Sequence, residues 1–514
     1  MEFNSFMNIK VPHHDKMPNN LLNYLIIMPV LFATFFHFLY LDTNSFWLDE
    51  AYSISFVNLS WSRLWDLISQ REANMSLYYV LLKIWVGAFG DSEFVARSLS
   101  VIFAVGGLIM TYLIGVRLFN IRTGLTAGFI LAVNAFFIQY AREARGYTLL
   151  LLLITTSMYL FIRVLERQQY KYYLALGLIN ALVLYAHFYG FFVLIAQVTS
   201  LAFLPAGTIR WRRMLTCAIL TASLAAPLGV FILTRESYLL GWVAKSSLRD
   251  IFFLFMTLAG DGGKFLLLSY FFPCFLSFVI AIRILHRFKR SQLLWRHTLL
   301  LWWLFVPILS IYLVSIFKPS FVDRYMISSL PALVLLAGAG LSSLRSKALY
   351  VMATSLIIIL SLHAVFYVYY PKKKHEWRPA TRLIVQNSKA GDAILFYSWA
   401  AKIPFEYYYW KMHGRTDILV SVWPSPLGTP IGVATFNQSP NPIQSMLESL
   451  TERYDRLWVV LAHDIIPGLG WDSRLIIHTI ENKYIKLKDI SFKGINIKLY
   501  ERYSVTDKHI DKNI

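Results

Sequence analysis

The sequence predicts a polytopic α-helical membrane protein that carries a small α/β domain at its C-terminus. Hydrophobic residues make up 57% of the 514 residues and charged residues only 15%, whereas soluble domains have about 25% charged residues. Long apolar runs recur up to Tyr370, and no run after Pro371 is long enough to cross a membrane. The short apolar pieces of the last part of the chain are typical of the strands and helices of an α/β domain.

Eleven apolar runs approach the length of about 20 residues that crosses about 30 Å of hydrocarbon. They are 21–41, 94–116, 123–141, 146–165, 171–187, 188–206, 214–234, 264–285, 298–317, 324–343 and 348–370. An odd number of spans places the two termini on opposite sides of the membrane. Two shorter apolar segments, 77–89 and 248–259, are predicted to lie at the outer surface without crossing it.

The cationic residues between the spans predict the orientation. If 1–20 forms a cytoplasmic tail, every short inner loop contains arginine or lysine, as the positive-inside rule requires. Most acidic residues before Pro371 then fall in the outer loops, which are 42–93, 142–145, 235–263 and 318–323. The C-terminal domain is therefore expected outside the cytoplasm.

The net charge of +20 does not indicate a nucleic-acid partner, because the cationic side chains lie in short clusters between apolar runs. Membrane lipids are the expected partners of these clusters. The two cysteines, Cys217 and Cys274, lie inside apolar runs and form no zinc-binding spacing.

Residues 371–514 are predicted to form the extracytoplasmic α/β domain. Apolar or alternating segments at 393–398, 456–462 and 495–503 predict strands, and helical patterns occur at 376–388 and 440–453.

The first candidate site is the carboxylate pair Asp49 and Glu50, which directly follows the first span. Carboxylates beside hydrocarbon are costly to desolvate, so they usually line a wet cavity, pair with cations or bind a metal. The alternative is that both are simply solvated in a loop.

Cationic and aromatic residues of other outer loops are expected on the same side. Arg142, Glu143 and Arg145 share one short loop, and a local salt bridge is the alternative to an anion site there. Arginine suits phosphate because it donates two parallel hydrogen bonds. The other candidates are Arg324, which could instead anchor its helix in the interface, and the pair His187 and Tyr189, of which the histidine could be an ordinary interfacial residue.

Seven segments, taken together and in order, resemble the GT-C superfamily of membrane glycosyltransferases. The resemblance is to the family-39-like branch, which includes protein O-mannosyltransferases and lipid A aminoarabinose transferases. The segments are 46–53 (FWLDEAYS), 77–100, 117–125, 140–153 (YAREARGYTLLLLL), 186–197, 323–338 (DRYMISSLPALVLLAG) and 376–396.

The resemblance implies a GT-C fold and an inverting transferase. It also implies a location in the inner (plasma) membrane of a bacterium, with the active site outside the cytoplasm. Such an enzyme takes a monosaccharide from a polyprenyl-phosphate donor and passes it to a hydroxyl of a glycan, lipid or protein. It also implies that Asp49 is the general base and that Glu143 supports the metal or the acceptor, with Glu50 beside them. Relatives commonly carry a His-Pro-Pro or Lys-Pro-Pro triplet where this chain has Asn74, Met75 and Ser76, and Asn74 cannot neutralise a phosphate.

The inferred chemistry requires one base and several cations. A departing lipid phosphate needs charge neutralisation, which Arg142, Arg145, Arg324 or a metal can supply. The attacking hydroxyl must lose its proton to a carboxylate. A divalent cation, Mg²⁺ or Mn²⁺, is a candidate cofactor on Asp49 and Glu143. The alternatives are a lipid-linked sugar transporter or flippase, a polysaccharide polymerase, and a non-catalytic scaffold.

Overall fold

The computed structural model describes residues 25–234, 243, 245–370, 375–397, 399–412, 419–423, 451–462 and 473–503. The predicted cytoplasmic tail 1–20 lies outside these residues. Contacts divide the chain into two compact units. The first is helical and contains the described residues of Met1–Leu41, Trp61–Glu236 and Val243–Pro371. The second joins Asp42–Ser60 to the described residues of Lys372–Ile514.

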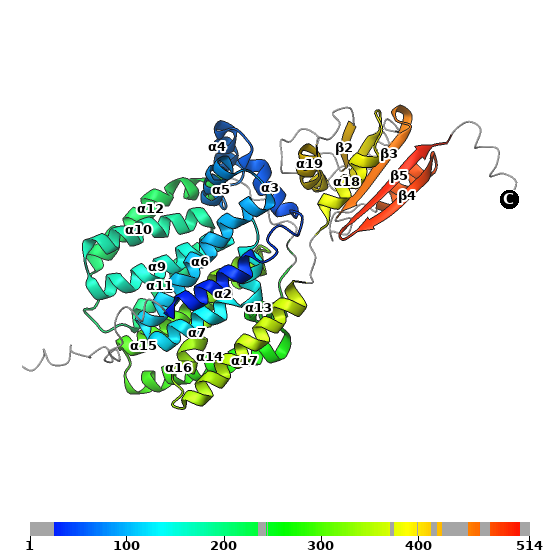
Figure 1. Ribbon diagram of the computed structural model, residues 1–514. Helices are drawn as coiled ribbons and strands as arrows, with labels where there is room; N and C mark the ends of the chain where they lie inside the picture. Colours follow the sequence, from blue (N-terminus) through cyan, green and yellow to red (C-terminus); the bar gives the residue numbers. More distant parts are fainter. Residues whose placement is uncertain are drawn as a thin grey trace, which may run out of the picture. The chain divides into compact units, whose positions relative to one another are not determined.

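The first unit consists of helices (Figure 1), and each of the eleven predicted runs contains at least one of them. The α-helices are α2 (Ile27–Phe38), α4 (Trp61–Gln70), α5 (Ser76–Phe89), α6 (Glu93–Leu118), α7 (Ile121–Ala132), α8 (Ala135–Ala141), α9 (Tyr147–Arg167), α10 (Tyr170–Ala186), α11 (Gly190–Ser200), α12 (Trp211–Thr234), α13 (Leu248–Ala259), α14 (Gly263–Arg287), α15 (Gln292–Phe317), α16 (Leu330–Ser342) and α17 (Lys347–His363). Short 3₁₀ segments at Leu201–Phe203 and Asp323–Ser329 and a π-helix at Ala364–Tyr369 complete the unit.

Several of these helices can cross a membrane. By length and composition seven helices of the described residues qualify, or eight if the bent pair α7 and α8 counts as one span. The remaining predicted spans contain shorter helices, namely α2, α10 and α11. The two segments predicted to lie at the surface, 77–89 and 248–259, form helices α5 and α13. The polytopic helical membrane fold is therefore confirmed.

The bend between α7 and α8 positions the second predicted outer loop. The two helices differ in direction by 64°, and Asn134 lies at the break. Its Oδ1 accepts a hydrogen bond from Phe137 N at 2.9 Å, which caps α8, and its Nδ2 donates to the Leu258 carbonyl at 2.9 Å. The cap satisfies an N-terminal amide that the helix itself leaves without a partner. The chain then turns through residues 142–146 into α9.

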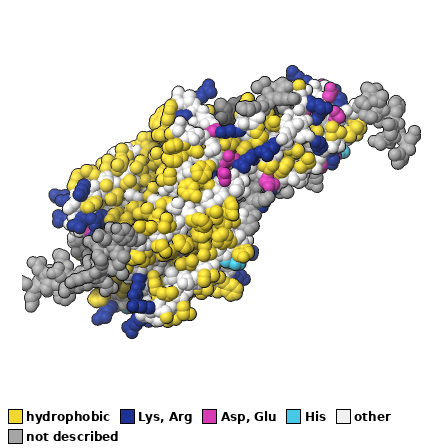
Figure 2. Space-filling model, in the orientation of Figure 1, with side chains coloured by type: hydrophobic (Ala, Val, Ile, Leu, Met, Phe, Trp, Pro, Cys, Tyr) yellow, Lys and Arg dark blue, Asp and Glu magenta, His cyan; other side chains and the backbone are white. Residues whose placement is uncertain are grey.

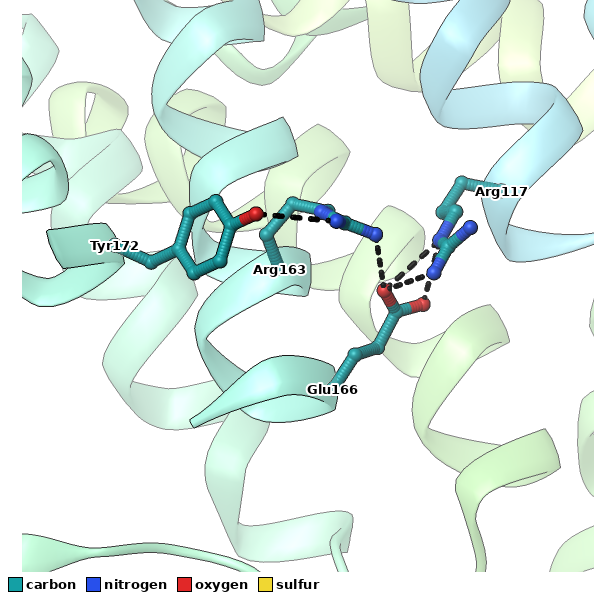
Figure 3. A network of polar contacts seen from close by, with 4 residues as sticks. All are labelled: Arg117, Arg163, Glu166 and Tyr172. Atoms are coloured by element: carbon teal, nitrogen blue, oxygen red, sulfur yellow. Dashed lines mark hydrogen bonds and ion pairs between the residues drawn. The ribbon is translucent and has the colours of Figure 1, made fainter. Parts of the chain in front are cut away.

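The opposite end of α9 carries a charged network (Figure 3). Arg117 donates three hydrogen bonds to Glu166: from Nε to Oε1 at 2.9 Å and to Oε2 at 2.8 Å, and from Nη2 to Oε2 at 2.6 Å. Arg163 adds a contact to Glu166 at 3.4 Å and donates to the Tyr172 hydroxyl at 3.2 Å. A 21-residue helix is about 30 Å long, so this network lies about one hydrocarbon thickness away from the start of α9.

The surface of the helical unit agrees with a membrane setting. Figure 2 shows hydrophobic side chains over most of the visible face of this unit, with lysines and arginines gathered at its edges. The arginines of the charged network belong to loops predicted to face the cytoplasm.

The second unit contains a five-stranded sheet with the order β2-β1-β3-β5-β4. Its strands are β1 (Ala393–Tyr397), β2 (Leu419–Trp423), β3 (Arg456–Ala462), β4 (Tyr484–Phe492) and β5 (Ile495–Arg502). β1 is parallel to β2 and β3, whereas β5 is antiparallel to β3 and β4. The three predicted strands and the helix at 376–388 are confirmed, and most of the predicted helix 440–453 lies outside the described residues.

Alternating side chains of the sheet contribute to two cores. Ile394 and Phe396 pack with α18 (Trp377–Asn387) and α19 (Lys402–Lys411), while Ala393 and Leu395 pack with α21 (Ser473–Glu481). This period of two is that of a strand buried on both faces. β2 and β4 were not predicted. In β4 the side chains between Tyr484 and Ile490 are exposed, so the strand lacks the apolar alternation that marks a half-buried strand.

Candidate active site

The carboxylate pair begins a short helix of the second unit, α3 (Leu48–Val57). Asp49 and Glu50 lie in its first turn, where the N-terminal end of the helix dipole stabilises negative charge. Glu50 is 0% exposed, and its Oε2 accepts a hydrogen bond from Trp47 N at 3.3 Å. Asp49 is half-buried. Burial, together with the nearby charge of Asp49, raises the pKa of Tyr52. Glu50 therefore caps the helix, and Asp49 is the more exposed carboxylate.

Helix α3 is fastened to the C-terminal domain. Phe46 N donates to the Tyr408 hydroxyl at 2.7 Å, and the Phe46 ring packs on Tyr407 with ring centres 5.0 Å apart. Arg378 N donates to Ser45 Oγ at 3.0 Å. The candidate base is therefore carried by a segment that α18 and α19 hold in place.

Arg145 lies among tyrosines of the first unit. It directly precedes α9, and its Nη1 donates to the Tyr79 hydroxyl of α5 at 3.2 Å. The same guanidinium lies 5.9 Å from the centre of the Tyr147 ring. Its backbone carbonyl accepts a hydrogen bond from Ser100 Oγ at 3.3 Å. These contacts fix a cation beside two aromatic rings, a combination that binds anionic and sugar groups well.

Arg324 and His187 belong to the same cluster. Arg324 lies 5.6 Å from the ring centre of its neighbour Tyr325, and Tyr325 in turn packs on His187 at 4.6 Å and on Tyr189 at 4.9 Å. Burial, followed by the positive charges of Arg145 and Arg324, lowers the pKa of His187 to about 3. The Tyr147 ring beside Arg145 packs on Tyr325 with ring centres 6.4 Å apart, so Arg145, Arg324 and His187 lie around the same pair of tyrosines.

Asn74 holds the turn that carries the histidine. Its Oδ1 accepts from Phe188 N at 3.2 Å, and its Nδ2 lies 3.4 Å from His187 Nε2. His187 Nδ1 lies 3.2 Å from Tyr189 N, and the Tyr189 hydroxyl donates to the Ser320 carbonyl at 2.7 Å. Asn74 therefore contacts the candidate site through His187.

Arg142 has other surroundings in the first unit, whereas Glu143 lies in the same turn as Arg145. Glu143 is 1% exposed within the turn between α8 and α9, where its carbonyl accepts from Arg145 N at 2.7 Å. Arg142 is directed to Tyr40, Tyr369 and Tyr370. The structure thus brings together Asn74, Arg145, His187, Tyr189 and Arg324, whereas Arg142 joins a second group.

Three tyrosines were not predicted as site residues, namely Tyr79, Tyr147 and Tyr325. The sequence did contain a signal for two of them, because each follows an arginine of an outer loop by one or two positions, as Arg145-Gly146-Tyr147 and Arg324-Tyr325. Among the described ranges no group of three or more histidine, cysteine or acidic side chains is close enough to hold a metal ion.

Known proteins resemble this chain in sequence and in fold. Residues 76–233, from α5 to α12, match the family model of dolichyl-phosphate-mannose-protein mannosyltransferases. Over 92% of this chain, the fold matches 97% of ArnT from Cupriavidus metallidurans, with a TM-score of 0.57 and 14% identity for its apo state. The same shares are covered in ArnT bound to undecaprenyl phosphate, with a TM-score of 0.58 and 12% identity. The fold is that of the GT-C membrane glycosyltransferases.

The GT-C fold also relates the chain to a larger enzyme. The apo oligosaccharyltransferase of Archaeoglobus fulgidus matches with a TM-score of 0.54 and 12% identity, over 85% of this chain and 69% of the other. No curated protein sequence matches the chain. The resemblance inferred from the seven segments is confirmed, and with it an integral membrane protein. The matched family segment contains Arg142, Glu143, Arg145, His187 and Tyr189 but neither Asp49 nor Arg324.

Proposed function

We propose that this GT-C protein is an inverting glycosyltransferase that moves a monosaccharide from a polyprenyl-phosphate donor to an acceptor hydroxyl. The observation that carries the proposal is the series of contacts that links the two arginines beside His187. Arg145 lies 5.9 Å from the Tyr147 ring, that ring lies 6.4 Å from the Tyr325 ring, and Arg324 lies 5.6 Å from the Tyr325 ring. Tyr79 accepts a hydrogen bond from Arg145. Two arginines suit a phosphate, and aromatic rings suit the apolar face of a sugar. The existence of an ArnT structure with bound undecaprenyl phosphate supports this class of donor.

Arg145 and Arg324 supply the positive charge that the departing lipid phosphate needs. A lipid phosphate is a weak base, so its departure requires neutralisation of charge rather than a proton. Arg145 and Arg324 provide two cations that tyrosines already orient, and such preorganised charge costs little reorganisation during the reaction. His187 stays neutral beside them, because its pKa lies far below physiological pH.

Asp49 is the proposed general base. The acceptor oxygen attacks the anomeric carbon from the face opposite the phosphate, the bond from that carbon to the phosphate oxygen breaks, and the acceptor proton passes to the Asp49 carboxylate. The configuration at the anomeric carbon is therefore inverted. Glu50 contributes by capping α3 and so fixing the backbone that carries Asp49.

The charges at the two ends of α9 support a proposal for the side of the membrane. Arg117, Arg163 and Glu166 lie at one end of α9 and Arg145 at the other. Because cationic loops mark the cytoplasmic side, we place the cluster and the C-terminal domain outside the cytoplasm of a bacterium. There the domain is proposed to recognise the acceptor, which can be a glycan, a lipid or a protein.

A divalent cation remains a proposal. Mg²⁺ is usually held by one or two carboxylates together with substrate phosphates. Asp49 and Glu143 are the carboxylates that would supply protein oxygens to Mg²⁺ or Mn²⁺. Loss of transfer upon EDTA treatment, restored by Mg²⁺ or Mn²⁺, would support this role.

A transfer assay in nanodiscs tests the proposed function. Purified protein is incubated with labelled polyprenyl-phosphate sugars and extracted membrane acceptors. We expect transfer by the wild type and a loss of about 10²- to 10⁴-fold in Asp49→Asn, the usual contribution of a general base. Asp66→Asn on exposed α4 is the control and should retain activity. If the wild type accepts only pyrophosphate-linked oligosaccharides, it is a polymerase instead. If it moves the lipid-linked sugar across the membrane without transferring the sugar to an acceptor, it is a flippase.

A further inference from the structure

The chain passes from the first unit to the second after Leu41 and again after Pro371. The residues just before these two points pack together inside the first unit. The rings of Tyr40 and Tyr370 have centres 5.8 Å apart, and the Tyr370 hydroxyl donates to the Phe36 carbonyl at 2.8 Å. We call residues 36–41 and 364–370, from which the chain leaves the first unit, the two exits. They lie side by side although they are far apart in the sequence.

Arg142 binds both exits. One of its terminal N–H groups donates to the Tyr40 carbonyl, and the other lies 3.4 Å from the Tyr369 hydroxyl. Its guanidinium carbon lies 5.1 Å from the Tyr370 ring centre and 5.6 Å from that of Tyr369. The side chain of Arg142 is only 6% exposed. Cation–π contacts of this kind gain strength when they are desolvated.

The backbone at these exits is unusual in two ways. Tyr40 has φ of 58°, a left-handed conformation that is costly for a bulky residue. Residues Ala364–Tyr369 form a π-helix, which is rare and often found at functional sites. Such conformations persist only where surrounding contacts hold them. Arg142 supplies contacts to both, and buried Arg97 adds a hydrogen bond to the Leu41 carbonyl at 2.8 Å.

We propose that Arg142 is a positioning residue that clamps the two exits and thereby sets where the segment carrying Asp49 begins. The inference rests on the proposed function, since it assigns catalytic value to the placement of Asp49. It gives Arg142 a different task from Arg145, although both lie in one turn. Arg145 faces the cluster around His187, whereas the guanidinium of Arg142 is engaged by three tyrosines of the exits.

Kinetics with labelled donor distinguish the two tasks. Arg142→Met keeps the length of the side chain but removes its charge and donors. We expect kcat to fall about 10- to 100-fold, the scale on which a small misplacement of catalytic groups acts, with the donor KM unchanged within about twofold. Arg142→Lys should recover part of kcat, because an ammonium keeps the cation–π contacts but lacks the planar fork that reaches Tyr40 and Tyr369 together.

Hydrogen exchange gives a readout that does not depend on activity. In nanodiscs, Arg142→Met should exchange faster than wild type in segments 36–41 and 364–370, and Arg142→Lys should be intermediate. Arg122→Met is the matched control, because Arg122 also lies over a tyrosine, Tyr350, at 5.7 Å, but at the opposite ends of α7 and α17. It should leave both segments and kcat unchanged.

Two results would overturn the proposal that Arg142 clamps the two exits. One is unchanged exchange of both segments in Arg142→Met. The other is a donor KM raised about tenfold with kcat intact, which would make Arg142 a phosphate ligand. If the wild type transfers no sugar, the proposed function fails, but the exchange experiment still decides whether Arg142 clamps the exits.

Discussion

The backbone N–H of Phe46 donates a hydrogen bond to the hydroxyl of Tyr408 over 2.7 Å, and 362 positions separate the two residues. Phe46 lies three residues before Asp49, so this bond ties the candidate base to helix α19 of the C-terminal domain. The domain therefore holds the segment that carries Asp49, the candidate base.

Tyr408→Phe tests this link. The substitution leaves a buried N–H without its acceptor, which costs about 1–3 kcal/mol. We expect a lower unfolding temperature of the second unit and a reduced kcat, because α3 loses one of its attachments. Thermal unfolding and the transfer assay measure these effects. Tyr170→Phe, whose ring lies at the exposed start of α10, serves as the control. If Tyr408→Phe and Tyr170→Phe have the same unfolding temperature and the same kcat, the hydrogen bond from Phe46 N to Tyr408 does not stabilise α3.

Arg145→Met and Arg324→Met should weaken donor binding. Each removes one of the two cations of the cluster, and hydrogen bonds to charged groups contribute about 1.5–3 kcal/mol. We expect the apparent affinity for undecaprenyl phosphate to fall about 10- to 100-fold in either variant. Competition of undecaprenyl phosphate against labelled donor measures it. Unchanged affinity in both variants would place the phosphate elsewhere.

His187 should make stability depend on pH. Its folded-state pKa is lowered to about 3, below its unfolded value of about 6.5. The unfolded chain therefore binds this proton first, so stability is complete above about pH 6.5 and falls as the pH drops toward 3. Between pH 7 and pH 5 the loss from this group is about 2 kcal/mol.

The contribution of His187 is isolated by comparison with His187→Gln. Unfolding temperatures recorded from pH 7 to pH 5 should decrease less in this variant than in the wild type. Parallel curves for the two proteins would mean that His187 titrates normally in the folded state.

Ser157→Ala should destabilise the helical unit. Ser157 Oγ donates to Asn180 Oδ1 at 2.5 Å and accepts from Gln197 Nε2 at 2.7 Å, so it joins α9, α10 and α11. The alanine leaves two buried amides without this partner, at a cost of about 1–2 kcal/mol. The neighbouring Thr156→Ala is the control, because its hydroxyl bonds only to the Leu152 carbonyl of its own helix. A similar unfolding temperature for both variants would contradict the prediction.

Much of the fold could be predicted because its causes are local. The length of each apolar run is set by the thickness of hydrocarbon, and β1 and β3 are short apolar runs buried on both faces. Short helices such as α3 and α4 escaped prediction because they lack such a run, and β4 escaped because most of its side chains are exposed.

The candidate site was predictable only in part. The sequence by itself determined that arginines, acids and tyrosines gather in the loops between spans, because burying them in hydrocarbon is costly. Only the tertiary structure decided that Arg145 and Arg324 lie around Tyr147 and Tyr325, beside His187, while Arg142, three residues before Arg145, turns to Tyr369 and Tyr370. It also decided that Asp49 belongs with the C-terminal domain. These pairings depend on the bend at Asn134 and on contacts hundreds of residues apart, which no local pattern encodes.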